Sequence, residues 1–214
     1  MKVIFGTTNK RKIEDLKTII DNNNLDLEIL TLSDIGWNLG EIEENGTTLE
    51  ENSLIKAQTI YSFCKQNDIN YPIITDDAGL FVDVLNGEPG IYTARYADEE
   101  LKNNPELPKY ECVNKLLRNL NNLENRKAKY KCVVTCMFEN GEYFQTKGES
   151  EGSISNEIIE PINKPYFYSV FILTGENRTF NLLTKEEIKE TYRYKALEKT
   201  LRKCVKIWFE LKSE

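Results

Sequence analysis

The stretch "YPIITDDAGLFV", residues 71–82, constrains the fold of this chain more than any other, because two adjacent carboxylates interrupt an apolar run. Two isoleucines and Thr75 precede Asp76 and Asp77, and the next apolar run starts three positions after the pair, at Leu80. A carboxylate that leaves water needs a cation or several hydrogen-bond donors to offset the cost. We therefore predict a short buried strand that ends at the acid pair, followed by a turn at Ala78-Gly79, with a cation or several hydrogen-bond donors near the two acids.

The rest of the chain mixes strand-like and helix-like segments, which is typical of an α/β fold. Apolar residues at helical spacing predict helices over residues 10–23, 49–66 and about 110–120, the second with Leu54, Ala57, Tyr61 and Cys64 on its apolar stripe. A last helix should open at Thr184 with Glu187 as its capping-box partner.

Strands are expected at residues 2–5 and 167–173, with a hairpin over 129–150 that turns at Asn140-Gly141. Residues 98–108 should form a polar loop. No repeat or linker divides the sequence, so we expect one α/β domain over residues 1–214.

Composition excludes several classes of protein. The net charge of −7 argues against a general surface for nucleic acid polymers. No apolar run is long enough to span a bilayer, and the N-terminus has no signal-peptide pattern. Five scattered cysteines do not resemble a disulfide framework, and we expect Cys132 and Cys136 to be buried in the core. These features predict a reduced, cytoplasmic protein that does not bind membranes.

The chain contains no histidine, which restricts its chemistry. Mechanisms that use imidazole as a base or as a partner of a nucleophile are excluded. Acid–base and metal chemistry must therefore use carboxylates, lysines, tyrosines and arginines.

The N-terminal segment "FGTTNKRK" has the features of an anion site. Thr7, Thr8 or Asn9 can cap the helix that follows, and Lys10 and Lys12 lie in its first turn. Free backbone N–H groups and the positive end of a helix favour an anion. An ordinary capped helix with solvated lysines is an equally good reading, since the Walker spacing is absent.

The acid-rich stretch "EIEENGTTLEENSLIKA" strengthens the case for a site. Glu44 and Glu51 are the better candidates to face the acid pair, whereas Glu50 is expected to be solvated. Glu51 lies three residues before Leu54 and so extends the apolar stripe of its helix, with Lys56 on a different side. Carboxylates without histidine suit magnesium, or manganese in its place, better than zinc.

Four segments together resemble the inosine/xanthosine triphosphate pyrophosphatase family. They are "TTNKRKIEDL", "LEENSLIKA", "DDAGLFVDVLNGEPGIYTARYA" and "YRYKALEKTL", in the family's order and approximate spacing. The resemblance runs from residue 1 to about 203. It implies an elongated mixed sheet with flanking helices and two lobes around a nucleotide-binding cleft. It also implies a magnesium-dependent homodimer that cleaves deaminated purine triphosphates to monophosphate and pyrophosphate and so cleans the nucleotide pool.

The resemblance also implies roles for individual residues. Thr7, Thr8, Asn9, Lys10 and Lys12 match the phosphate loop, and Lys56 matches a phosphate-binding lysine. Glu44 matches a metal ligand, and Asp77 matches the residue that is both metal ligand and general base, with Asp76 in support. Ala78 occupies a substrate-contacting position where serine is more usual.

The C-terminal half departs from the family pattern at the positions that read the base. Phe167 and Tyr168 stand where tyrosine and aspartate are expected, and the Ser-His-Arg signature reads Thr191-Tyr192-Arg193. Tyr192 also continues a predicted helical stripe, so a core tyrosine is as good a reading as a ligand contact. The usual base-contacting lysine aligns with Glu187, which we read as a helix cap, or with Lys185.

The leading hypothesis is a magnesium-dependent pyrophosphohydrolase that acts on inosine- or xanthosine-type nucleotides or has an altered base preference. A nucleotide-binding sensor on the same scaffold, with little turnover, is the first alternative. A pyrophosphatase for pyrimidine or modified nucleotides, similar to the septum-inhibitor group, is the second. That group usually opens with a serine-rich loop, which this chain lacks.

Overall fold

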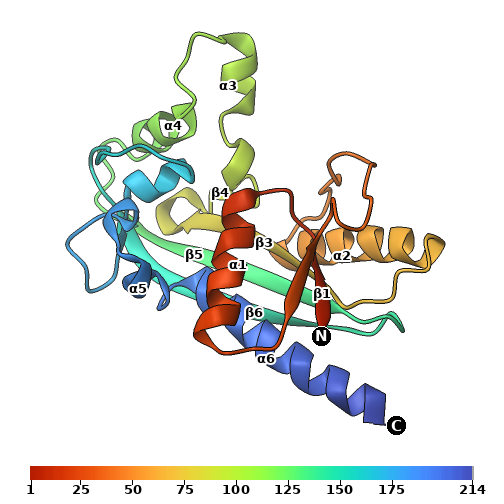
Figure 1. Cartoon of the computed structure of the whole chain (residues 1–214). Coiled ribbons are helices and arrows are strands. Elements are labelled where there is room, and N and C mark those ends of the chain that lie inside the picture. The colour runs from red at the N-terminus through yellow and green to blue at the C-terminus, as the bar shows by residue number, and fades with distance from the viewer. Residues whose placement is uncertain (214) are drawn as a thin grey trace. The chain divides into compact units, whose positions relative to one another are not determined.

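A computed structural model describes residues 1–213 of the chain and, for residues 1–210, the side chains (Figure 1). These residues form two compact units. The first comprises residues 1–77 and 132–148 and the segment from Arg193 onward, and the second comprises residues 78–131 and 149–192. The expectation of one domain over residues 1–214 stays a prediction, as does the cleft between two lobes.

The strands form a mixed sheet in the order β2-β1-β3-β5-β6-β7, with β4 paired to β3. β1 (Lys2–Phe5) lies parallel to β2 (Glu28–Thr31) and to β3 (Ile73–Val82). Parallel neighbours need crossover connections, and α1 (Lys10–Asn22) and α2 (Leu49–Gln66) lie within them. The predicted mixed sheet with flanking helices is therefore confirmed.

β5 (Lys127–Met137) and β6 (Tyr143–Ile154) are neighbours in the sheet and confirm the predicted hairpin. Their connection is too short for a parallel crossover, so the two strands run antiparallel. The amide of Phe138 donates to the carbonyl of Glu142 (2.8 Å) and closes the loop around Asn140-Gly141. Cys132 and Cys136 on β5 are buried, as predicted, and all five cysteines are free.

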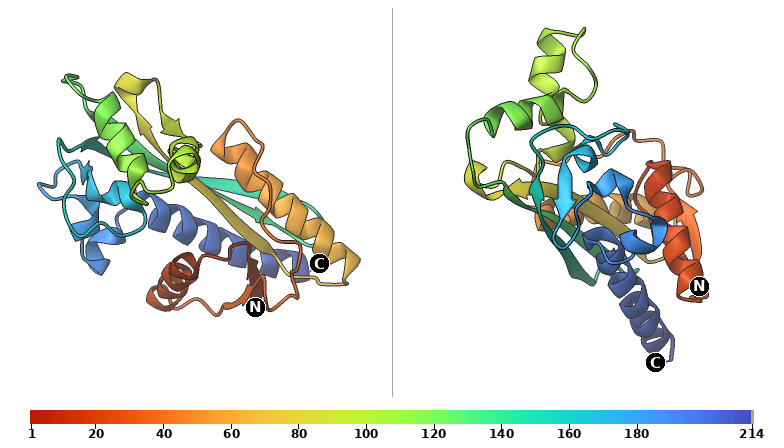
Figure 2. Two further views of the ribbon diagram at one scale, coloured as in Figure 1. Left: turned by 90° about the horizontal axis from the view of Figure 1, so that it is seen from above. Right: turned by 90° about the vertical axis from the view of Figure 1, so that its left-hand side faces the viewer.

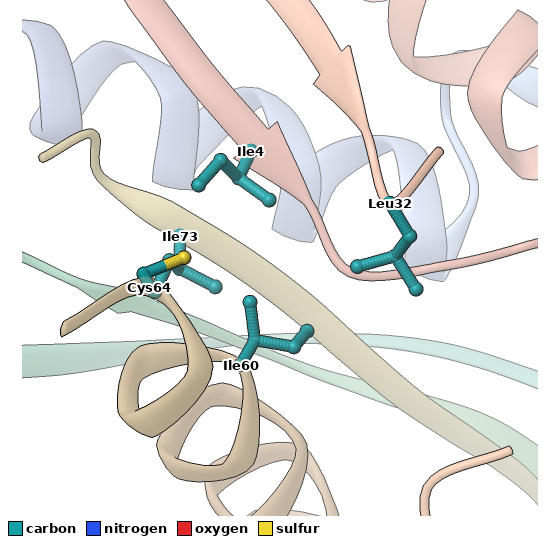
Figure 3. Close-up of a cluster of buried hydrophobic side chains, with 5 residues drawn as sticks. All are labelled: Ile4, Leu32, Ile60, Cys64 and Ile73. Carbon is teal, nitrogen blue, oxygen red and sulfur yellow. The ribbon is translucent and has the colours of Figure 1, made fainter. Parts of the chain in front are cut away.

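In the first unit, α2 lies on one face of the sheet, and α1 and α6 (Tyr192–Ser213) lie on the other (Figure 2). A cluster of buried apolar side chains joins α2 to the strands: Ile4, Leu32, Ile60, Cys64 and Ile73 (Figure 3). Ile73 of β3 belongs to this cluster, so the odd-numbered residues at the start of β3 face α2. Since successive strand residues point to opposite faces, the even-numbered ones face α1 and α6.

The buried face of α2 differs from the predicted stripe. Ala57 and Cys64 are buried, as predicted, but Leu54 and Tyr61 are only partly buried, and Glu51 is exposed rather than part of the stripe. Three polar side chains are buried in the first half of the helix instead: Asn52, Ser53 and Lys56. The prediction from apolar spacing is therefore right toward the C-terminal end of α2 and wrong in its first half, because polar side chains that contact β3 are buried there.

β3 also corrects a prediction, because the strand continues through the acid pair to Val82 instead of ending there. The predicted turn at Ala78-Gly79 is therefore wrong. Gly79 serves a different purpose, since a Cβ at this position would collide with the carbonyl oxygen of Gly90. Leu80 pairs with Gly90 of β4 (Pro89–Gly90), so the glycine permits two strands to approach closely.

The second unit contains short helices and an aromatic core. Its helices are α3 (Asp98–Asn103), α4 (Glu111–Asn119) and α5 (Lys185–Ile188), with 3₁₀ turns at Asp83–Leu85, Thr93–Arg95, Tyr166–Ser169 and Phe180–Leu182. β7 (Phe171–Leu173) pairs antiparallel with β6, so only the end of the predicted strand at 167–173 is a strand. α3 replaces the first part of the polar loop expected at 98–108.

The predicted last helix is interrupted. Thr184 and Glu187 form the predicted capping box, but the helix that they open, α5, ends at Ile188. The amide of Tyr192 donates to Ser150 Oγ (2.8 Å) instead of continuing the helical ladder, and α6 starts afresh at Tyr192. A side-chain acceptor on a neighbouring strand thus breaks a segment whose local pattern is helical.

Candidate active site

The N-terminal loop presents the start of α1 to solvent. Asn9 is the N-cap, and its side-chain oxygen accepts from the amide of Arg11 (3.0 Å). Thr7 Oγ1 accepts from the amide of Asn9 (3.2 Å) and shapes the turn before the helix. Thr8, Asn9 and Lys10 are exposed, and the first turn contains no acid. The positive end of α1 is therefore available to an anion.

The acidic loop before α2 is fastened to the first turn of that helix. The amide of Gly46 donates to Asn52 Oδ1 (2.9 Å), and a Cβ at Gly46 would lie 2.7 Å from that oxygen. The Glu51 carboxylate accepts hydrogen bonds from the amide of Thr47 (2.6 Å) and from the hydroxyl of Thr47 (2.8 Å). Thr48 is the N-cap of the helix. The Glu51 carboxylate is thus engaged in holding the loop in place. Glu50, the acid expected to be solvated, pairs with Lys147.

Lys56 gathers two of the predicted carboxylates on the α2 face of β3. Its Nζ lies 3.2 Å from Glu44 Oε2 and 3.7 Å from Asp77 Oδ1, and the residue is only 8% exposed. Asn52 Nδ2 donates to Asp77 Oδ2 (3.2 Å) from one turn earlier on α2. Asn52 was not predicted, although its position four residues before Lys56 puts it on the same helix face and could have identified it.

A second group of charges surrounds Asp76 on the opposite face of β3. Lys12 Nζ donates to both carboxylate oxygens, at 3.1 Å to Oδ1 and 3.0 Å to Oδ2. Arg193, at the start of α6, donates from Nη1 to Oδ2. The Asp76 side chain is 1% exposed. One buried carboxylate therefore holds a cation from α1 and a cation from α6.

The two adjacent acids differ in their electrostatic environment. Burial raises the pKa of Asp77 above its ordinary value, and Glu44 adds to the rise while Lys56 opposes it. Burial also opposes ionisation of Asp76, but Arg193, Lys12 and Lys56 outweigh it and hold the pKa of that carboxyl well below its usual range. Asp77 is therefore the one suited to exchange a proton, whereas Asp76 is a permanent anion.

Buried hydroxyls fix α2 against the strands behind this site. Ser53 Oγ lies 2.7 Å from Thr135 Oγ1 on β5, and Thr75 Oγ1 on β3 donates to the Ser53 carbonyl (2.7 Å). Gln145 on β6 donates to Thr135 Oγ1 (3.0 Å) and to the carbonyl of Glu50 (2.9 Å). Buried polar groups with partners specify one arrangement, so this network sets the position of α2 relative to Asp77.

Glu44 and Asp77 are the candidate ligands for a metal ion at this site. Within the described residues, no three His, Cys, Asp or Glu side chains gather into a ready-made metal site. Glu44 and Asp77 do converge on one cation, Lys56, and their oxygens are the type of ligand that magnesium uses. Magnesium commonly takes one or two protein carboxylates and completes its shell with water and substrate phosphates. Two carboxylates therefore fit this ion, while they would not make a zinc site.

The predicted base-contacting residues of the second unit lie in its aromatic core. Phe167 and Tyr192 are 2% exposed and Tyr168 is 8% exposed. The Tyr168 and Tyr192 hydroxyls bond to each other (2.8 Å), and the Tyr192 ring stacks on Tyr130 with centroids 4.9 Å apart. The core reading of Tyr192 is therefore supported. Contact of these three side chains with a base stays a prediction, and their burial argues against it. Ala78 is half-buried on β3.

Glu187 has the capping role that we preferred. Its carboxylate accepts from the Thr184 amide (2.7 Å) and from Arg178 (2.6 Å), and these bonds lower its pKa to about 2. No described helix has both the length and the apolar character needed to cross a membrane.

Comparison with known proteins gives consistent matches over most of the chain. The model of the Ham1 family matches residues 3–203. A protein of Clostridium perfringens named dITP/XTP pyrophosphatase is 35% identical over 206 residues, which is 92% of this chain and 94% of that protein. A protein of the same name from Clostridium tetani is 35% identical over 187 residues, or 86% of each chain. The solved structure of the Staphylococcus aureus Ham1 protein superposes with a TM-score of 0.77 at 29% identity, covering 94% of this chain and 97% of that one.

Proposed function

Because the chain belongs to the Ham1 family, we propose that it hydrolyses a nucleoside triphosphate to the monophosphate and pyrophosphate with the help of magnesium. It is an enzyme of the nucleoside triphosphate pyrophosphatase type, a hydrolase of phosphoric anhydrides. The substrates are purine nucleotides of the inosine or xanthosine type, or, if the base preference of the enzyme is altered, nucleotides with another base.

The observation that carries this proposal is that the side chains of the two adjacent acids lie on opposite faces of β3, in different electrostatic environments. Asp77 has a raised pKa, lies beside Glu44 and Lys56 and keeps 14% of its side chain exposed. These are the properties of a carboxylate that accepts a proton from water. A water oxygen attacks the α-phosphorus, the bond to the bridging oxygen breaks, pyrophosphate leaves, and Asp77 takes the proton.

The other residues bind the triphosphate. Lys56, from the α2 face, and Lys12, from the α1 face, supply positive charge. Donors at the start of α1 supply hydrogen bonds to phosphate oxygens: Thr7, Thr8, Asn9 and Lys10. Glu44 and Asp77 would hold magnesium, which manganese can replace. When bound, such an ion stabilises negative charge on phosphate oxygens and makes a water more acidic.

Base selection is the part of the function most specific to this chain. A pocket that reads one edge of a base needs polar groups that match it. Tyr168 and Tyr192 bond to each other, so their hydroxyls are already engaged, and Arg193 pairs with Asp76. We therefore expect weaker discrimination for inosine and xanthosine triphosphates than the family pattern implies, or preference for another base.

The alternative, a nucleotide-binding sensor without useful turnover, is disfavoured by the carboxylates of Glu44 and Asp77 beside Lys56. A protein that only binds anions has no evident need for three carboxylates beside its lysines. Homodimerisation, a cytoplasmic location and the absence of nucleic acid and membrane partners remain part of the proposal. Light scattering of the purified chain measures the first of these.

One experiment tests the function. Purified protein is incubated with inosine, xanthosine, adenosine, guanosine and pyrimidine triphosphates in magnesium, and pyrophosphate and monophosphate are quantified. Equal amounts of the two products from at least one nucleotide support the proposal. Tight binding without product would favour the sensor. A preference above about a hundredfold for inosine and xanthosine triphosphates would contradict the expected loss of base discrimination.

A further inference from the structure

Asp76 stands apart from the proton-transfer chemistry assigned to its neighbour. Strand alternation points its side chain to the face opposite Asp77, and the contacts of the two side chains agree with this. Asp77 meets Asn52 and Lys56 of α2, whereas Asp76 meets Lys12 of α1 and Arg193 of α6. The Asp76 side chain is 1% exposed, so it has almost no surface on which a substrate could bind.

The contacts of Asp76 explain what this buried carboxylate does. Both of its oxygens accept from Lys12, and Oδ2 also accepts from Arg193. A lysine ammonium is a flexible point charge, and a carboxylate that takes two of its contacts fixes its position. The ammonium has three donors, so it can hold Asp76 and still contact a phosphate oxygen.

We propose that Asp76 is a positioning residue that fixes Lys12 and Arg193 on the α1/α6 face of β3, so that the polyphosphate of the substrate meets preorganised cations. Asp76 takes no proton and holds no metal. The inference rests on the proposed function in one respect, that the site takes a polyphosphate.

Charge alone predicts the opposite outcome, and this makes the proposal testable. Lys12, Arg193 and Asp76 together carry a net charge of +1, and Asp76→Asn raises it to +2. Simple attraction would then tighten the binding of a polyanion. Positioning predicts weaker binding in spite of the added positive charge, because the ammonium of Lys12 is no longer held.

The probe is inorganic tripolyphosphate, whose binding is measured by calorimetry with and without magnesium. We expect Asp76→Asn to weaken binding by at least about tenfold, equivalent to about 1.4 kcal/mol. KM for the nucleotide should rise by a similar factor, and kcat should fall by less. Glu111→Gln is the matched control, because Glu111 is also buried and bonded to an arginine, Arg118, in the second unit. It should leave tripolyphosphate binding unaltered.

A second pair of variants limits the loss of stability if Asp76→Asn alone does not fold, because Arg193→Gln removes one of the two cations that Asp76→Asn would leave unpaired. In Arg193→Gln, Asp76 still holds Lys12, and residues 12, 76 and 193 together carry a net charge of zero. Adding Asp76→Asn releases Lys12 and raises the net charge of these three residues to +1. The double variant should bind tripolyphosphate more weakly than Arg193→Gln alone. Tighter binding in either comparison, a loss confined to kcat, or no binding by the unaltered protein would overturn the proposal. A protein that binds the probe but releases no pyrophosphate from any nucleotide would instead refute the proposed function.

Discussion

Asp76→Asn should destabilise the folded protein much more than Asp77→Asn does, although the two residues are neighbours on one strand. Asp76→Asn removes the anion shared by Lys12 and Arg193, whose side chains are only 25% and 17% exposed. Removing one partner of a buried ion pair costs about 3–5 kcal/mol. The remaining exposure of the cations puts the expected loss near the lower limit, about 3 kcal/mol.

The matched change at Asp77 should cost less. Its side chain is 14% exposed, and Lys56 keeps Glu44 at 3.2 Å as a counter-ion. Asparagine can also still bond to Asn52. We expect a loss of about 1 kcal/mol, typical of one weakened hydrogen bond.

Urea denaturation followed by circular dichroism at pH 7, without metal or nucleotide, measures both losses. In a thermal melt of the same samples, each kcal/mol lowers Tm by about 2–4 °C for a chain of this length, so Asp76→Asn should lower it by about 6–12 °C and Asp77→Asn by about 2–4 °C. Equal losses, or a larger loss at Asp77, would refute the assignment of Lys12 and Arg193 to Asp76.

Three further substitutions concern Asp77, Lys56 and the cap of α5. Asp77→Asn should lower kcat by at least about a hundredfold, as expected for a lost general base, and near-normal turnover would remove it from that role. Lys56→Ala should chiefly raise KM for the triphosphate, and unchanged affinity in a binding assay would contradict the phosphate contact. Glu187→Gln should lower stability at pH 7. Because the folded-state pKa of Glu187 is lowered to about 2, its contribution is complete above the ordinary value of 4.5 and is lost as the pH falls toward 2. The difference between variant and unaltered protein in urea should therefore shrink below about pH 4, and a constant difference would count against the cap.

Local signals were enough to predict the elements whose partners are near in sequence. Asn9, one of three candidate caps, caps α1, Thr184 and Glu187 form a capping box, and Asn140-Gly141 lies in the hairpin loop. Each of these depends on hydrogen bonds between residues a few positions apart. The stretch "YPIITDDAGLFV" also predicted that the two acids need a cation or several donors, because the cost of desolvation does not depend on the fold, but it did not show which residues supply them.

The errors have a common physical cause, which is a partner far away in sequence. Gly79 resembles a turn residue, yet it permits close approach of Gly90 within a continuous strand. A helical pattern runs through residue 192, yet Ser150 takes the amide of Tyr192 and breaks the helix. The side chains of Asp76 and Asp77 point to opposite faces of the sheet because β3 continues through them. This could not be predicted while the strand was expected to end at the pair.

The position of the bond that breaks tests the central claim most directly. The purified protein is given its best nucleoside triphosphate in magnesium and ¹⁸O-labelled water, and the products are separated by mass. Attack of water at the α-phosphorus places one label in the monophosphate and none in pyrophosphate. Label in pyrophosphate, or release of orthophosphate and diphosphate, would contradict the account of Asp77 as a base that delivers water to the α-phosphorus.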